Sequence, residues 1–135
     1  MPRELPALLL DRSVGGERAR RALTELGFQV VLEYELTGAD RHHDPTPDEV
    51  WLRLAGERGL VIVTADKRIM RRRLEREALV AAGTWVIVLT LRDQTHEHLV
   101  RAFGRHRAAI ERAVLETDPP AAWRLNAGGL TRVEL

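Results

Sequence analysis

Four apolar runs of strand length recur along the chain, and their alternation with segments of helical spacing constrains the fold more than any other feature. The runs are Ala7–Leu10, Phe28–Leu32, Leu60–Thr64 and Thr84–Leu91. Unbroken apolar runs are typical of parallel strands that are buried on both faces. Strands that alternate with helices predict an α/β protein, here a three-layer α/β/α domain with a mainly parallel central sheet.

Between and after these runs, four segments carry helix signals: 14–26, 46–58, 67–82, and from 93 or 95 to about 117. The second has the clearest start, because Thr46 suits the N-cap, Pro47 the first helical position and Glu49 the third. The polar stretch Glu33–Pro45 predicts a loop.

Length and composition fit one domain. The chain has 135 residues, of which 44% are hydrophobic, which is enough for a single core. We therefore expect one domain over residues 1–135, with residues 118–135 as a C-terminal extension. In that extension Asn126-Ala-Gly-Gly129 lies between two short apolar stretches and favours a hairpin.

Composition excludes several classes of function. The formal charge of +1 excludes a histone-like polycation, and the absence of cysteine excludes disulfides and thiolate metal sites. Aromatic residues make up 4% of the chain, too few for a surface that stacks bases. The apolar run Leu5–Leu10 is too short for a membrane span or a signal-peptide core, so we expect a cytoplasmic protein.

Carboxylates stand where the predicted strands end. Asp11, Asp66 and Asp93 follow the first, third and fourth runs, and the second run leads through a loop to Asp48 in the first turn of a helix. Parallel strands bring these ends to one edge of the sheet, where open α/β sheets bind ligands. Converging carboxylates repel one another unless a cation such as Mg²⁺ neutralises them. Each aspartate alone is equally typical of a turn or a cap, so the joint pattern is what predicts a metal-dependent phosphoryl-transfer site.

Asp48 is a better ligand candidate than its neighbour Glu49. Trp51 and Leu52, three and four positions after Asp48, are apolar and are expected to face the sheet. Glu49 can instead close a capping box with Thr46, which is a supporting role.

Three stretches carry a resemblance to a known family. They are 8–11 (Leu-Leu-Leu-Asp), 48–52 (Asp-Glu-Val-Trp-Leu) and 61–69 (Val-Ile-Val-Thr-Ala-Asp-Lys-Arg-Ile). Over about residues 7–92 the chain resembles the PIN-domain nuclease superfamily, and within it the compact PIN-like branch found as toxins of toxin–antitoxin modules. Arg12 stands where many relatives have a second acid or a small polar residue.

The resemblance implies a PIN-like fold and an endoribonuclease that depends on Mg²⁺ or Mn²⁺. Carried onto this sequence, the catalytic metal ligands would be Asp11, Asp48 and Asp66. Thr64 would be a supporting hydroxyl, and Asp93 a fourth ligand by position. The resemblance also implies the toxin of a type II pair, with RNA as substrate and a cognate antitoxin protein as partner, and it allows a homodimer.

Cations gather directly after Asp66. Residues 67–77 include six Lys or Arg residues and two Glu residues. Such a patch beside an acidic site suits the phosphate backbone of RNA, although a solvated helix face with Glu–Arg pairs explains the same pattern. The residues predicted to bind RNA are Lys67, Arg68, Arg71 and Arg72.

Two other readings remain open. One is a catalytically inactive PIN-like module that binds nucleic acid or protein. The other is a receiver-like phosphoacceptor domain, which also gathers acids at this edge but needs two adjacent acids after an early strand. Arg12 after Asp11 does not match that requirement.

Overall fold

The computed structural model describes residues 4–38, 48–91 and 95–135, without the side chains of residues 37, 48 and 49. In chain order the elements are β1 (Leu8–Leu10), α1 (Glu17–Glu25), β2 (Val30–Leu32), α2 (Glu33–Thr37), α3 (Asp48–Glu57), β3 (Val61–Thr64), the 3-10 helix η1 (Lys67–Met70), α4 (Arg73–Ala82), β4 (Trp85–Leu89), α5 (His96–Arg105), α6 (Arg107–Glu116), β5 (Ala121–Asn126) and β6 (Gly129–Val133).

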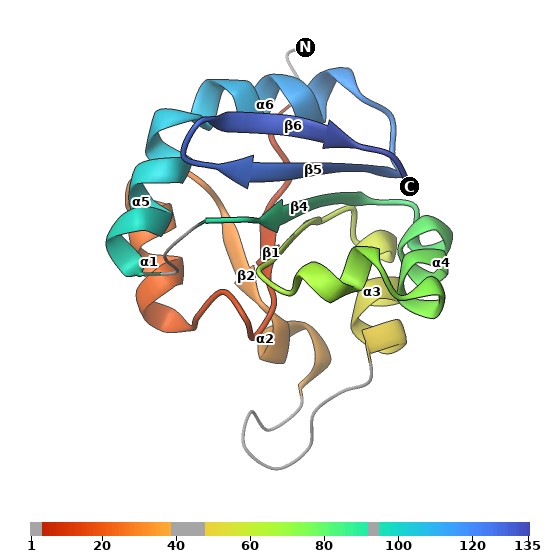
Figure 1. The fold of residues 1–135 in the computed structure, drawn as a ribbon. Coiled ribbons are helices and arrows are strands. Elements are labelled where there is room, and N and C mark those ends of the chain that lie inside the picture. Colours follow the sequence, from red (N-terminus) through yellow and green to blue (C-terminus); the bar gives the residue numbers. More distant parts are fainter. Residues whose placement is uncertain (1–3, 39–47, 92–94) are drawn as a thin grey trace.

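The strands form one six-stranded sheet in the order β2-β1-β3-β4-β5-β6. Every neighbouring pair is parallel except β5 and β6, which are antiparallel. The predicted α/β class and mainly parallel sheet are therefore confirmed (Figure 1). All strands from β1 to β5 end at one edge, because parallel strands joined by crossovers share their carboxyl ends.

Helices cover the sheet on both faces because successive strand residues point to opposite sides. Leu8 and Leu10 pack with α1, α5 and α6, whereas Leu9 packs with α2, α3 and α4. Figure 1 shows α1 and α5 on one side of the strands and α3 and α4 on the other. Buried residues of this kind are what the unbroken apolar runs predicted.

The polar stretch after β2 is not all loop, which corrects the prediction for Glu33–Pro45. Residues 33–37 form α2, directly after the strand. The backbone N–H of Leu32 donates to Oε1 of Glu35 at 3.0 Å, which satisfies one of the donors at the start of the helix. Gly38, at φ 71°, ends it in the left-handed conformation.

The helix predicted for Val14–Leu26 begins later, at Glu17. Asp11 is the cause, because its Oδ1 accepts from the backbone N–H of Ser13 at 2.8 Å and its carbonyl accepts from the N–H of Val14 at 3.1 Å. These bonds hold residues 11–14 in a turn, so the apolar Val14 precedes the helix rather than belonging to it.

Two long predicted helices are each divided. The segment 67–82 forms η1 and α4, separated where Arg72 takes an extended backbone at ψ 123°. The segment that reaches residue 117 forms α5 and α6, which meet at His106 with φ −108°. Thr95 caps α5 by accepting from the N–H of His98 at 3.4 Å, and Asp93, the other candidate cap, lies outside the described residues.

The C-terminal residues form the pair β5–β6, and β5 also extends the sheet by pairing in parallel with β4. Val88 of β4 lies opposite Arg124, and Leu89 opposite Leu125. Strand β5 of this hairpin therefore ends at the same edge of the sheet as β1 to β4 (Figure 1). None of the described helices is both long and apolar enough to cross a membrane.

Candidate functional site

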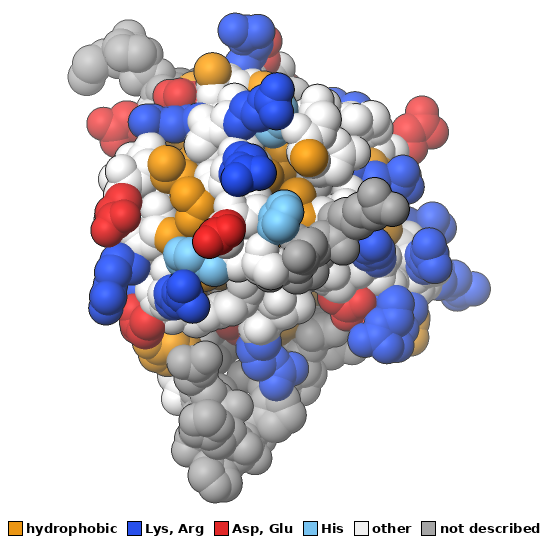
Figure 2. All heavy atoms as spheres, turned by 60° about the vertical axis from the view of Figure 1, so that its left-hand side comes forward, with side chains coloured by type: hydrophobic (Ala, Val, Ile, Leu, Met, Phe, Trp, Pro, Cys, Tyr) orange, Lys and Arg blue, Asp and Glu red, His pale blue; other side chains and the backbone are white. Residues whose placement is uncertain are grey.

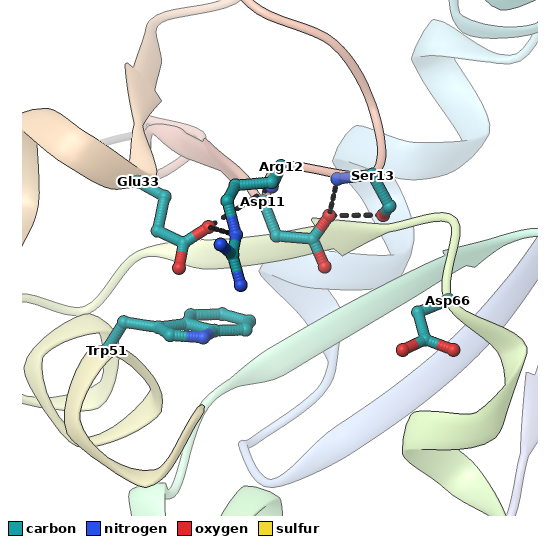
Figure 3. Close-up of a pocket in the computed structure, with 6 residues that line it drawn as sticks. All are labelled: Asp11, Arg12, Ser13, Glu33, Trp51 and Asp66. Atoms are coloured by element: carbon teal, nitrogen blue, oxygen red, sulfur yellow. Dashed lines mark hydrogen bonds and ion pairs between the residues drawn. The ribbon is translucent and has the colours of Figure 1, made fainter. Parts of the chain in front are cut away.

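A pocket of about 150 Å³ opens at the carboxyl edge of the sheet (Figure 3). Two of the predicted ligands, Asp11 and Asp66, line it from the ends of β1 and β3. The other lining residues are Arg12, Ser13, Glu33 and Trp51. The shared carboxyl edge of parallel strands therefore brings together two acids that are 55 positions apart in the chain.

Asp11 is a buried carboxylate, with 7% of its surface exposed. Its Oδ1 accepts hydrogen bonds from both the N–H and the hydroxyl of Ser13. Burial raises the pKa of Asp11, the hydrogen bonds from Ser13 and Thr64 oppose that rise, and the negative charge of Asp66 adds to it. The site therefore holds a carboxylate whose charge is poorly compensated by the protein itself.

Hydroxyl groups connect the loop after β1 to the loop after β3. The Ser13 hydroxyl oxygen accepts from the N–H of Ala65 at 2.8 Å and lies 3.4 Å from the hydroxyl of Thr64. Thr64 is fully buried, and its hydroxyl oxygen accepts from the N–H of Asp66 at 3.1 Å. Thr64 and Ser13 thus fix the positions of the two acids relative to each other.

Asp66 is more exposed and is held by a cation. It caps η1, since its Oδ1 accepts from the N–H of Arg68 at 3.0 Å, and the same oxygen accepts from Nε of Arg68 at 3.1 Å. Burial alone would raise the pKa of Asp66, but these bonds and the charges of Arg68 and Arg72 outweigh it and lower the pKa.

Glu33 lines the pocket although the sequence patterns above do not point to it. It is 7% exposed and lines the pocket beside Asp11, because β2 pairs directly with β1. The signal was present: Glu33 directly follows the last residue of a predicted strand, as Asp11 does. The polar residues that continue after Glu33 favour a loop instead.

Arg12 binds Glu33 at the mouth of the pocket. Its N–H donates to Oε2 of Glu33 at 3.1 Å, and its Nε lies 3.7 Å from the same oxygen. Figure 3 shows the guanidinium of Arg12 lying between Glu33 and Asp11, above the ring of Trp51. The described residues of the pocket therefore combine three carboxylates with one arginine.

The side chains of the remaining predicted acids lie outside the part of the chain that the structure describes. Asp48 and Glu49 open α3, but only their backbone is described. Trp51, three residues after Asp48, does line the pocket, which agrees with the face expected for that helix. Asp93 lies outside the described residues, as does Thr46, the predicted partner of Glu49.

The donor set fits a small, hard divalent cation. Among the described side chains, no group of three or more His, Cys, Asp or Glu residues is close enough to hold a metal ion. Mg²⁺, however, needs only one or two carboxylates and takes its other ligands from water and phosphate. Asp11 and Asp66 both use Oδ1 for hydrogen bonds, and Figure 3 shows the second oxygen of Asp11 directed into the pocket.

The predicted RNA-binding residues are all exposed, but they divide into two groups. Arg68 is paired with Asp66, and Arg72 with Glu75 at 3.0 Å. Lys67 and Arg71 take part in none of the ion pairs among the described residues.

On the face with α1 and α5, basic, acidic and hydrophobic side chains are interspersed, and Lys and Arg are densest at the right-hand edge of that view (Figure 2).

One comparison with known proteins gives a match. A family model described as a PIN-like domain matches residues 6–91, which is more than half of the chain. The matched segment contains β1 to β4 and both Asp11 and Asp66, and it ends before α5. No curated protein and no solved structure matches the chain.

Proposed function

Because this chain belongs to the PIN-like domain family, whose fold is of the nuclease type, we propose that it is an endoribonuclease that depends on Mg²⁺ or Mn²⁺ and hydrolyses RNA phosphodiester bonds. The observation that carries the proposal is the presence of Asp11 and Asp66 in one pocket at the carboxyl edge of the sheet. Open α/β sheets bind their ligands at this edge.

In this proposal Asp11 and Asp66 hold the cation, and Asp48 completes the ligand set from the first turn of α3. A bound divalent ion supplies positive charge that activates water and stabilises the leaving oxygen in phosphodiester hydrolysis. Asp93 remains a further candidate ligand.

The groups around the two acids act by positioning. Ser13 and Thr64 hold Asp11 and the loop before Asp66, so the two carboxylates keep their spacing. Arg68 fixes Asp66 from the other side and keeps it ionised, since it lowers the pKa of that carboxyl. The raised pKa of Asp11 implies that cation binding competes with a proton at this residue.

We further propose that the enzyme is the toxin of a type II toxin–antitoxin pair and acts in the cytoplasm, with a cognate antitoxin protein as partner. The support is the resemblance of residues 7–92 to the compact toxin branch. Expression of the chain should arrest growth, co-expression of the adjacent gene should restore it, and Asp11→Asn should be harmless without that gene. Unimpaired growth on expression of the active nuclease would contradict the toxin role.

The nuclease itself is tested by incubating the purified protein with RNA in EDTA, Mg²⁺ and Mn²⁺. We expect cleavage only with a divalent ion, and loss of cleavage in Asp11→Asn. Cleavage that persists in EDTA, or that survives Asp11→Asn, would overturn the assignment of the site.

A second candidate, an inactive PIN-like binding module, is favoured by the ion pair of Arg12 with Glu33. That pair places a cationic side chain in the pocket that a metal would enter. Thermal unfolding separates the candidates, because a ligand that binds the folded state raises the melting temperature. Mg²⁺ should stabilise the nuclease and leave an inactive module unchanged.

A further inference from the structure

A second and larger groove lies on the α4 side of the sheet, near the same edge as the Asp11 pocket. It encloses about 540 Å³, against about 150 Å³ for that pocket. Met70, Val88 and Val133 are its apolar lining residues. Its polar lining residues are Lys67, Arg71, Thr90, Arg124, Asn126 and Glu134.

Strand register places Arg124 in this groove. Arg124 lies opposite Val88 of β4 and Thr131 of β6, and residues directly opposite in a sheet share a face. Val88 belongs to the core on the α3 and α4 side, so Arg124 points to that side too. Trp123, its neighbour, packs on the other face of the sheet.

The charge of the groove is strongly positive for its size. Lys67, Arg71 and Arg124 are exposed, and within the described part of the chain none of the three forms an ion pair. Among the described residues that line the groove, Glu134 is the single carboxylate. Other exposed arginines of the described chain, such as Arg18, Arg58 and Arg112, also take part in no ion pair, so what distinguishes the groove is that three such cations line one concave surface.

We propose that this groove binds the phosphate backbone of single-stranded RNA and that Arg124 is one of its phosphate contacts. The proposal rests on the proposed ribonuclease function and names the path of its substrate. Lys67, which lines the groove, directly follows Asp66, which lines the Asp11 pocket, so the groove begins beside the candidate site and reaches the C-terminal hairpin at Arg124 and Asn126. The family model ends at residue 91, so Arg124 is a contribution of this chain beyond the matched segment.

Backbone contact is the recognition mode that these residues supply. Lys and Arg bind phosphates without regard to base sequence, and the binding weakens as salt rises because counterions are released. None of the described residues that line the groove is aromatic, so they offer no ring on which a base could stack. An acidic peptide is the competing ligand chemistry, and the position of Lys67 next to Asp66 of the proposed nuclease site favours RNA over it.

The test measures binding of fluorescein-labelled oligouridine by anisotropy in EDTA, over a range of salt concentrations. We compare the wild-type chain with Arg124→Ala, Arg71→Ala and Arg124→Lys. Each alanine variant should lower the log–log salt slope by about 0.7 and weaken binding roughly threefold, the loss of one phosphate contact on a single strand. Arg124→Lys keeps the charge and should retain the slope.

Arg132→Ala is the matched control. Arg132 lies on the same hairpin, but its guanidinium sits 5.5 Å from the centre of the Trp123 ring and is absent from the groove lining. Its removal should leave the salt slope unchanged. Far-ultraviolet circular dichroism of each variant confirms that the hairpin change has not unfolded the chain.

The outcomes separate this inference from the proposed function. An unchanged slope in both alanine variants overturns the groove, and cleavage by the wild-type chain with Mg²⁺ would then leave the nuclease intact. Binding that depends on Arg124 in a chain that never cleaves RNA supports the groove and overturns the nuclease. If a glutamate-rich peptide, and not oligouridine, depends on Arg124, the RNA assignment is wrong.

Discussion

Asp11 and Asp66 follow neighbouring parallel strands and line one pocket, yet their surroundings shift their pKa values in opposite directions. Burial raises the pKa of Asp11, and the described groups that hydrogen-bond to it, Ser13 and Thr64, are neutral. Asp66 has 31% of its side chain exposed and is bound by Arg68, so its pKa is lowered. The same residue type at equivalent strand ends therefore acquires different acidity from its neighbours alone.

This contrast suggests a division of roles. The lowered pKa keeps Asp66 ionised at physiological pH, so this carboxylate can attract a cation without first losing a proton. Asp11 carries a charge that the protein does not neutralise, so it gains most when a cation arrives. Cation binding should therefore require both acids, for different reasons.

The largest effect is expected on cleavage. Asp11→Asn and Asp66→Asn should each lower RNA cleavage by more than about 100-fold. Loss of a group that only hydrogen-bonds to a metal ligand already costs roughly 10–100-fold, and these variants change the proposed ligands themselves. Asp118→Asn, at an exposed position before β5, is the control and should cleave normally. If either pocket variant keeps wild-type cleavage, the two acids do not form one site.

A smaller effect is expected from the arginine beside Asp11. Arg12→Ala removes a positive charge from the pocket and releases Glu33, so Mg²⁺ should bind about tenfold more tightly in calorimetric titrations. Arg101→Ala removes an equal charge from the exposed surface of α5 and should leave the affinity unchanged. Weaker Mg²⁺ binding in Arg12→Ala would show that Arg12 organises the acids rather than opposing the cation.

The connection between the two loops can be cut at Ser13. Ser13→Ala removes the hydroxyl that donates to Asp11 and accepts from the N–H of Ala65, and should lower the free energy of unfolding by about 1 kcal/mol. It should also raise the pKa of Asp11 further, measured by carboxyl NMR titration. Ser13→Thr keeps the hydroxyl and is the control; a fall of the Asp11 pKa in Ser13→Ala would contradict the network.

The smallest effect is the pH dependence of stability in EDTA. The contribution of Asp11 is present below its ordinary pKa of 3.8 and is lost as pH rises through its raised folded pKa. The contribution of Asp66 is present above 3.8 and is lost as pH falls through its lowered folded pKa. At neutral pH, urea unfolding should show Asp11→Asn more stable than wild type and Asp66→Asn slightly less stable, a difference that solvent screening of Asp66 keeps small.

With Mg²⁺ added, the wild-type chain should become more stable than Asp11→Asn, because only the wild type gains the free energy of cation binding. If Asp11→Asn and Asp66→Asn change the free energy of unfolding in the same direction in EDTA, the contrast between the two acids is wrong.

The amino-acid sequence by itself determined the layered α/β fold and the edge at which Asp11, Thr64 and Asp66 meet. These features depend on local patterns, since apolar runs specify buried strands and parallel connection brings their ends together. The tertiary structure alone decided what surrounds each acid. Pairing of β2 with β1 brought Glu33 beside Asp11, and the pairing of β5 with β4 turned Arg124 toward η1. Which strands become neighbours is a property of the whole sheet, and the hydrophobic periodicity of a single strand does not encode it.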